Sequence, residues 1–144
     1  MQVYISGSND NLSRKEARAA LKYYASMLLT ERLQKNIKIF LKFDLDEDGG
    51  SAGPIDSINR PREFEIYINP SAGKRKQLIT IAHEMVHVKQ FARNELKYNT
   101  RRNVDKWQGQ YISREVDYFD KPWEIEAFGR ELGLYLRYMN QRKK

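Results

Sequence analysis

His83-Glu84-Met85-Val86-His87 contains both histidines of this 144-residue chain. Residues four apart on an α-helix leave the same face one turn apart, so the two imidazoles would point the same way. Two neutral imidazoles at this spacing can bind one zinc ion. Glu84 follows the first histidine, where its carboxylate can act as a general base on a metal-activated water. The alternative is a charged surface helix that happens to carry two histidines.

The flanking pattern predicts that this pentapeptide lies in the middle of a long helix, where a metal site would be buried. Helices are expected where apolar residues recur every three or four positions, and strands where apolar and polar residues alternate. These rules predict three strands and three helices, over residues 2–6, 13–35, 37–43, 63–68, 72–96 and 122–139. Residues 44–61 are expected to form a polar loop, and residues 97–121 show no clear period.

The composition indicates a single domain over residues 1–144, with 40% hydrophobic and 31% charged residues. No apolar run is long enough to span a bilayer, so we expect no membrane partner. The chain has no cysteine, and its first residues do not resemble a signal peptide. We therefore expect a cytoplasmic protein without disulfides or thiolate metal ligands.

The net charge of +7 is concentrated in short basic clusters, such as Lys74-Arg75-Lys76. Excess positive charge attracts nucleic acid, which makes nucleic acid a possible partner. The alternative is that these clusters are solvated helix faces and a frayed tail, since no recognised nucleic-acid-binding motif accompanies them.

The third ligand of a catalytic zinc site must be a carboxylate here, because the chain has no further histidine and no cysteine. The final helix offers Glu124, with Glu126 as the alternative. An apolar stripe on this helix is expected to face the core and consists of Ile125, Phe128, Leu132, Tyr135, Leu136 and Met139. Glu124 lies at the edge of that stripe and Glu126 points away from it, which favours Glu124. Both carboxylates would also suit a helix N-terminus electrostatically.

HEMVH followed by a glutamate on a later helix resembles the gluzincin metallopeptidases, over about residues 60–136. The resemblance implies an α+β, zincin-like fold. A short, mostly antiparallel sheet would pack on the N-terminal helix and the HExxH helix, and the C-terminal helix would supply the glutamate. Several gluzincin families have a small residue three positions after that glutamate, as Ala127 is here. They then carry Asp or Asn, where this chain has Phe128. The SprT-like family is similar in size and charge, but its motif ends in a third histidine.

The resemblance further implies a zinc-dependent endopeptidase that acts on a protein or peptide substrate. Zn²⁺ would be held by His83, His87 and Glu124, with Glu84 as the general base; manganese or iron also suit such ligands. The strand at 63–68 would pair with extended substrate, provided that it is an edge strand. A hydrogen-bond donor to the oxyanion is also required, and the candidates are Tyr111, Tyr118 and Arg130. The rival interpretations are a zinc-binding scaffold without turnover and a nucleic-acid-associated module.

Overall fold

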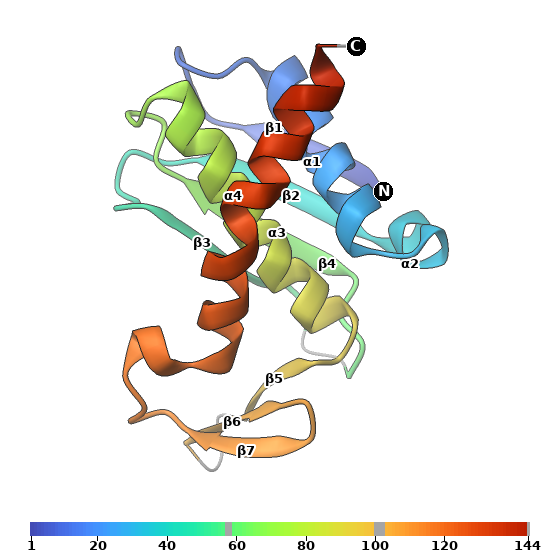
Figure 1. The fold of residues 1–144 in the computed structure, drawn as a ribbon, viewed down its shortest axis with the longest axis vertical. Coiled ribbons are helices and arrows are strands. Elements are labelled where there is room, and N and C mark those ends of the chain that lie inside the picture. Colours follow the sequence, from blue (N-terminus) through green and yellow to red (C-terminus); the bar gives the residue numbers. More distant parts are fainter. Residues whose placement is uncertain (57–58, 100–102, 144) are drawn as a thin grey trace.

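The structure is a computed structural model that describes residues 1–56, 59–99 and 103–143, with the side chain of Asn99 left out. Figure 1 shows a sheet crossed by helices, with a small hairpin sheet at one end of the molecule. The strands are β1 Gln2–Ser6, β2 Lys38–Phe43, β3 Gly50–Pro54, β4 Glu63–Ile68, β5 Leu96–Asn99, β6 Val104–Trp107 and β7 Gln110–Ser113. The helices are α1 Arg14–Leu28, α2 Glu31–Asn36, α3 Lys74–Ala92, the 3₁₀ helix η1 Tyr118–Asp120 and α4 Pro122–Arg142.

The larger sheet has the strand order β1-β2-β4-β3, and the smaller one has the order β5-β6-β7. Three of the five strand pairings are antiparallel, consistent with an α+β fold, but β1-β2 and β2-β4 are parallel. The parallel β1-β2 pair follows from its connection, because α1 and α2 carry the chain back to the starting edge. The strand at 63–68 is β4, which lies inside the sheet rather than at its edge. The expectation that this strand is an edge strand, free to pair with substrate, is therefore wrong.

The edge strand next to β4 is β3, and β1 is the edge strand on the other side of the sheet. β3 falls within the region 44–61 that was expected to be a polar loop. Its sequence, Gly50-Ser-Ala-Gly-Pro54, lacks the apolar alternation by which strands are recognised. Only one side of β3 is paired, and it pairs antiparallel with β4, from Gly50 opposite Ile68 to Pro54 opposite Phe64. Pairing with β4 therefore stabilises β3 as a strand, although the sequence of β3 does not itself favour a strand.

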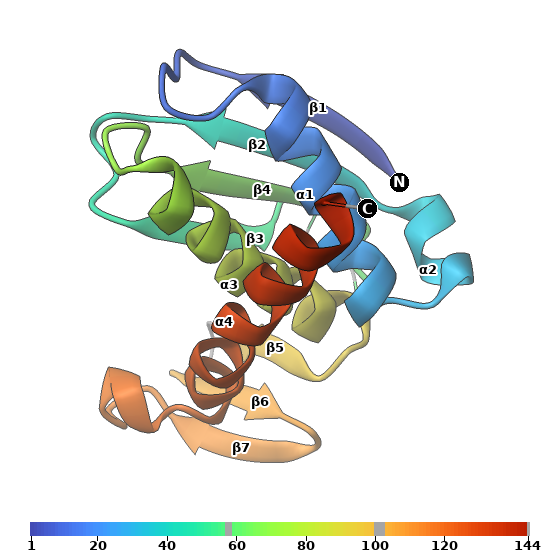
Figure 2. The same ribbon diagram turned by 45° about the horizontal axis from the view of Figure 1, so that its top comes forward.

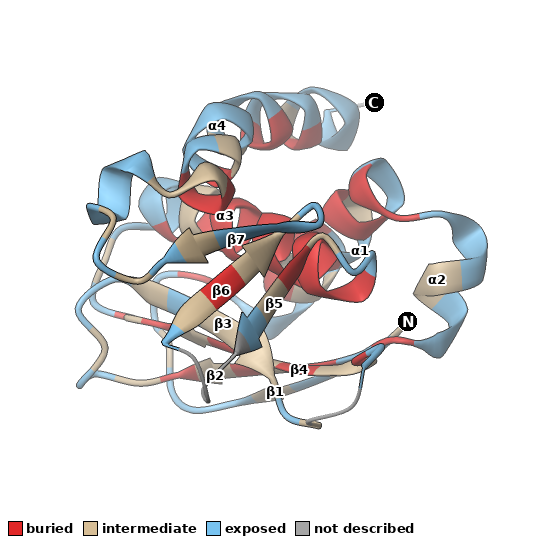
Figure 3. Ribbon diagram, turned by 90° about the horizontal axis from the view of Figure 1, so that it is seen from below, coloured by how far each residue is buried: buried red, intermediate tan, exposed pale blue. Residues whose placement is uncertain are grey.

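The core lies between three layers: the larger sheet, the pair α1 and α3, and α4. Figure 2 shows α1 and α3 against the same face of the larger sheet, and Figure 3 shows α4 stacked outside them. Inward-facing side chains alternate along the two central strands, with Ile39, Leu41 and Phe43 on β2 and Phe64, Ile66 and Ile68 on β4. Helix α3 packs against the sheet, α1, α4 and β5, so every residue from Ile81 to Ala92 is buried. Within the described ranges, no helix combines the length and apolar character needed to cross a bilayer.

The helix expected over residues 13–35 is two helices. Ser13 caps α1, because its hydroxyl accepts from the amide of Glu16 at 3.1 Å. Leu29 and Thr30 then adopt extended backbone, and the Thr30 hydroxyl accepts from the amide of Leu33 at 3.2 Å. Thr30 therefore acts as the N-cap of a second, short helix, which explains the break.

Helix α4 buries a different face from the apolar stripe that its sequence predicts. Its buried residues are Trp123, Glu124, Ala127, Leu134, Tyr135 and Tyr138. Four members of the expected stripe are exposed instead, namely Ile125, Phe128, Leu132 and Leu136. The face against α3 is occupied by the carboxylate of Glu124 and by small Ala127, so apolar content alone does not locate it.

This orientation of α4 predicts unequal effects of two similar substitutions. Leu134 is 3% exposed and Leu132 is 47% exposed. We expect Leu134→Ala to lower the free energy of unfolding by about 2–5 kcal/mol, because it leaves a cavity. Leu132→Ala should change it by no more than about 0.5 kcal/mol. Urea denaturation followed by circular dichroism measures both, and a larger loss for Leu132→Ala would support the orientation that the sequence predicts.

Candidate metal centre

Helix α3 brings both histidines of the motif to one buried point. The side chains of His83 and His87 are 9% and 8% exposed, and their ring centroids are 5.0 Å apart. Together with Glu84 they form a buried cluster whose ligand atoms all lie within 4.8 Å of one another. The expectation of a buried HExxH site on a long helix is confirmed, and this cluster could hold a metal ion.

Glu124 reaches this point from α4. Its Oε1 lies 3.1 Å from Nε2 of His83, and its Oε2 lies 3.2 Å from Nε2 of His87. Ligands of a tetrahedral zinc ion at about 2.0–2.1 Å are spaced about 3.3 Å apart, so each of these two nitrogen–oxygen distances is close to the spacing of two ligands on one ion. The donor set of two imidazoles and one carboxylate also suits zinc. The residues therefore fit the group that the motif implies.

The second nitrogen of each imidazole also has a partner. Nδ1 of His87 lies 2.8 Å from Oε1 of Gln90, whose amide nitrogen donates to the Trp123 carbonyl and to Glu126. Nδ1 of His83 lies 3.6 Å from Oε1 of Glu131. A hydrogen-bond partner such as Gln90 fixes the orientation and tautomer of a ligating imidazole, whereas Glu131 lies beyond hydrogen-bond distance. The sequence analysis did not identify Gln90 or Glu131. The available signal was that Gln90 lies three residues after His87 and Glu131 lies three residues after Phe128.

Phe128 stands where gluzincins usually have Asp or Asn, and it packs against the His83 ring with centroids 4.6 Å apart. Glu131, less than one turn further along α4, supplies the carboxylate beside Nδ1 of His83. The departure from the family pattern therefore does not leave this imidazole without a carboxylate neighbour.

Glu126, the alternative third ligand, lies in a separate network of charges. Its Oε2 accepts from Nζ of Lys89 at 2.7 Å and from Nε of Arg130 at 3.0 Å, and its Oε1 accepts from Gln90. The side chain is 19% exposed, so the expectation that it points into solvent is wrong. Glu126 acts on the cluster only through Gln90, and Glu124 is the carboxylate that contacts the histidines.

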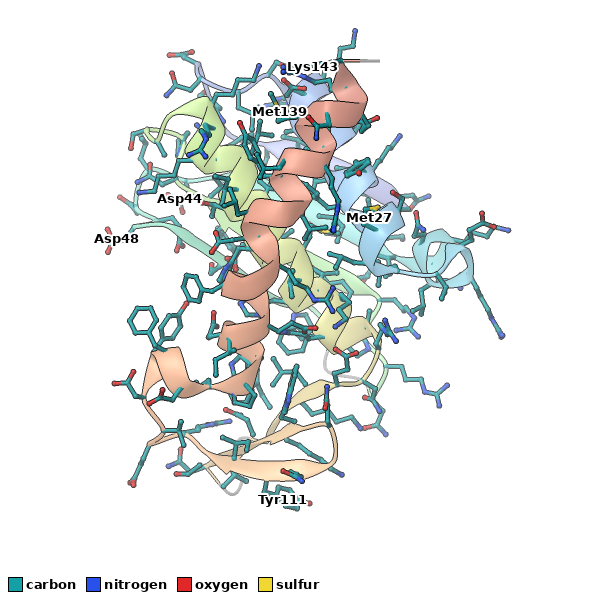
Figure 4. The ribbon with its side chains drawn as sticks, viewed as in Figure 1. Met27, Asp44, Asp48, Tyr111, Met139 and Lys143 are labelled. Atoms are coloured by element: carbon teal, nitrogen blue, oxygen red, sulfur yellow. The ribbon has the colours of Figure 1, made fainter. Side chains whose placement is uncertain are left out.

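The three candidate oxyanion donors lie in different places. The Tyr118 hydroxyl donates to Oε1 of Glu124 at 3.0 Å, which puts it at the cluster. Tyr111 lies on β7 at the far end of the molecule, exposed and beside Lys106 (Figure 4). Arg130 pairs with Glu126 on the outside of α4. The structure thus brings only Tyr118 to the histidines.

Burial and charge set the protonation of the carboxylates. Burial raises the pKa of Glu84, and although the two histidines oppose this, the pKa reaches about 7. Burial also acts to raise the pKa of Glu124, but hydrogen bonds from His83 and His87 outweigh it and lower the pKa to about 2. A carboxyl group with a pKa near neutrality can both accept and release a proton. Glu84 and Glu124 therefore differ in chemistry as well as position.

A cleft of about 680 Å³ opens onto His83 and Glu84. Its walls are the first three turns of α3, the start of β3, Tyr118, and Phe128 and Glu131 of α4. Gly50 of β3 passes so close to α3 that an added Cβ would lie 2.5 Å from Cγ2 of Thr80 and 3.1 Å from Oε2 of Glu84. Only glycine lets the edge strand run beside the Glu84 carboxylate without displacing it.

No protein-family model, curated protein or solved structure matches this chain. The description of the site therefore depends on the geometry of the described residues alone.

The positions of the two glutamates predict different effects on metal binding. Glu124→Ala should lower zinc affinity by more than about 100-fold, because it removes the carboxylate that contacts both imidazoles. Glu126 reaches the histidines only through Gln90, so Glu126→Ala should have a smaller effect. Competition with a chromophoric chelator measures both affinities. A larger loss for Glu126→Ala would contradict the ligand assignment.

Gln90 predicts an effect on the metal without contacting it. Gln90→Ala removes the acceptor at Nδ1 of His87 and should lower zinc affinity about 10–100-fold. Gln34, which is half-buried on α2, provides the control. If Gln34→Ala and Gln90→Ala have the same affinity for zinc, Gln90 does not orient His87.

Proposed function

We propose that the protein is a zinc-dependent endopeptidase. One observation carries the proposal: the Glu124 carboxylate contacts both imidazoles, and two members of this cluster, His83 and Glu84, line an open cleft. A site that only holds a structural ion is normally closed by four protein ligands. Three converging ligands next to a cleft favour a catalytic role over a purely structural one.

Each of the chain's own groups has a place in peptide hydrolysis. A bound zinc ion would supply Lewis-acid activation of the water and of the substrate carbonyl. Glu84, which lies beside the two histidines, takes a proton from the attacking water and later transfers it to the leaving amine. The Tyr118 hydroxyl, which donates to Glu124 here, would have to turn from that carboxylate to donate a hydrogen bond to the oxygen that gains negative charge.

The free edge of β3 supports a peptide as the substrate. This edge runs beside Glu84, and no strand among the described residues pairs with it on the side away from β4. An extended peptide can add to such an edge through main-chain hydrogen bonds. We therefore assign to β3 the substrate-pairing role that was expected for the strand at 63–68. The two strands are paired and lie at the same end of the HExxH helix.

Glu84→Gln separates catalysis from metal binding. The amide keeps the shape of the side chain but cannot accept the proton, so turnover should fall about 10²–10⁴-fold while bound zinc is retained. Cleavage of fluorescent casein and of a mixed peptide library, together with elemental analysis of zinc, provides the measurement. Glu63→Gln, on the exposed outer face of β4, provides the control and should keep full activity.

Zinc removal with a chelator should abolish the same activity, and added zinc should restore it. A zinc-loaded wild-type protein that cleaves neither casein nor the library would contradict the peptidase proposal. It would leave the zinc-binding scaffold as the better description.

A further inference from the structure

The cleft continues away from the histidines to a basic end. Arg75 and Lys76, in the first turn of α3, line it there, and His83 and Glu84 line it two turns later. The two ends therefore differ in charge: cations lie at one, and the carboxylates of Glu84 and Glu131 lie at the other. The proposed reaction gives no role to the basic end of the cleft.

Neither cation is neutralised by the protein. None of the ion pairs in the described part of the chain includes Arg75 or Lys76, whereas the adjacent Lys74 binds Glu16 at 2.8 Å. Lys76 and Asp48 line a smaller neighbouring hollow but form no ion pair. The Arg75 guanidinium lies 5.5 Å from the centre of the Tyr135 ring, a cation–π contact that holds it at the cleft wall.

The placement of these cations is unfavourable for the helix itself. The first turn of α3 contains three successive basic residues and no acidic one. A helix N-terminus carries partial positive charge, so cations there cost stability and anions add to it. Lys74 is compensated by its ion pair with Glu16, whereas Arg75 and Lys76 form no ion pair with a described residue. Residues that break a local rule in this way often mark a functional position.

We propose that Arg75 and Lys76 form a subsite for an acidic side chain of a peptide bound in the cleft. The inference rests on the proposed peptidase function and names its substrate class. An aspartate or glutamate at this end would form charge-assisted hydrogen bonds with both cations. The neutral main chain would lie beside Glu84, where a second negative charge would be repelled.

The topology also gives the position of the acidic residue. Arg75 and Lys76 precede His83 by eight and seven residues, which is about 10–12 Å along the helix. An extended peptide spans this distance in three or four residues. β3 runs antiparallel to β4, as does α3 (Figure 1), so a peptide antiparallel to β3 directs its C-terminal part towards the start of α3. The acidic residue therefore lies three or four residues after the cleaved bond.

A single acidic group fits the cleft better than a polyanion does. A nucleic acid carries a phosphate at every nucleotide, and some of these would lie against Glu84 and Glu131 at the other end of the cleft. A peptide can place its only negative charge at Arg75 and Lys76. The distribution of charge along the cleft thus favours an acidic peptide.

Binding to a cleavage-incompetent protein tests the subsite. The probe is a short fluorescent peptide of alanine and leucine with one aspartate, and matched peptides carry asparagine or lysine at that position. Fluorescence anisotropy with zinc-loaded Glu84→Gln protein should show roughly tenfold tighter binding of the aspartate peptide. Adding Arg75→Gln and Lys76→Gln should abolish this preference, and Arg75→Lys with Lys76 intact should keep most of it.

The matched control replaces Lys15 and Lys22 by glutamine. Both are exposed on α1 outside this cleft, and the change in net charge is the same. The control should keep the preference for aspartate. Equal loss in the two double variants, or no preference in the starting protein, would overturn the proposal. So would a short single-stranded oligonucleotide that competes with the peptide and whose affinity falls only in the Arg75/Lys76 variant, because the subsite would then recognise phosphate.

Cleavage by wild-type protein gives an independent readout. Mass spectrometry of the products should place the cleaved bond three or four residues before the aspartate, and cleavage only on the other side of it would overturn the direction. If the zinc-loaded protein cleaves nothing while the Arg75/Lys76-dependent binding persists, the peptidase proposal fails and the acidic-peptide site stands.

Discussion

The contact of Glu124 with His83 and His87 is the constraint on which the rest of the structure depends. It places a carboxylate and two imidazoles in the interface between α3 and α4, each less than a tenth exposed. Removing charged groups from water costs several kcal/mol per ion unless they are paired. The surrounding residues meet this requirement, since Tyr118, Gln90 and Glu131 each contact one of the three side chains. The face that α4 buries follows from this polar network.

The sequence predicted the parts of the site that are local. The spacing within HEMVH determines which way the imidazoles point, and helix α3 surrounds the motif as expected. Glu124 was also identified, although the reasoning that favoured it was partly wrong. The apolar stripe was expected to be buried, whereas Ile125, Phe128, Leu132 and Leu136 face solvent. Glu124 is buried because it contacts the histidines, and hydrophobic periodicity does not measure that interaction.

The parts that sequence reasoning missed are long-range or depend on backbone conformation. Strand β3 forms because β4 offers it a partner, and its glycine is needed for close passage over Glu84. The helix expected over residues 72–96 ends at Ala92, and β5 begins at Leu96. The rest of the β5-β6-β7 sheet lies within residues 97–121, which showed no period. A turn at Gln108-Gly109, both with positive φ, joins β6 and β7. Glycine at such a turn is a hairpin signal, but the glutamine before it weakens that signal.

The position of Glu124 has a consequence for how the chain holds together. His83 and Glu124 are 41 residues apart in sequence, and the segment between them includes the whole smaller sheet. An ion bound by residues of α3 and α4 would act as a cross-link that closes this loop. Closing a loop costs conformational entropy, and the interactions between its two ends must offset that free-energy cost. An ion bound between α3 and α4 would therefore stabilise the docking of α4 as well as the site. Loss of the ion would then favour detachment of α4, exposing apolar side chains such as Leu134 and Trp123. The affinity for the metal and the resistance of the protein to aggregation would be coupled through a single contact.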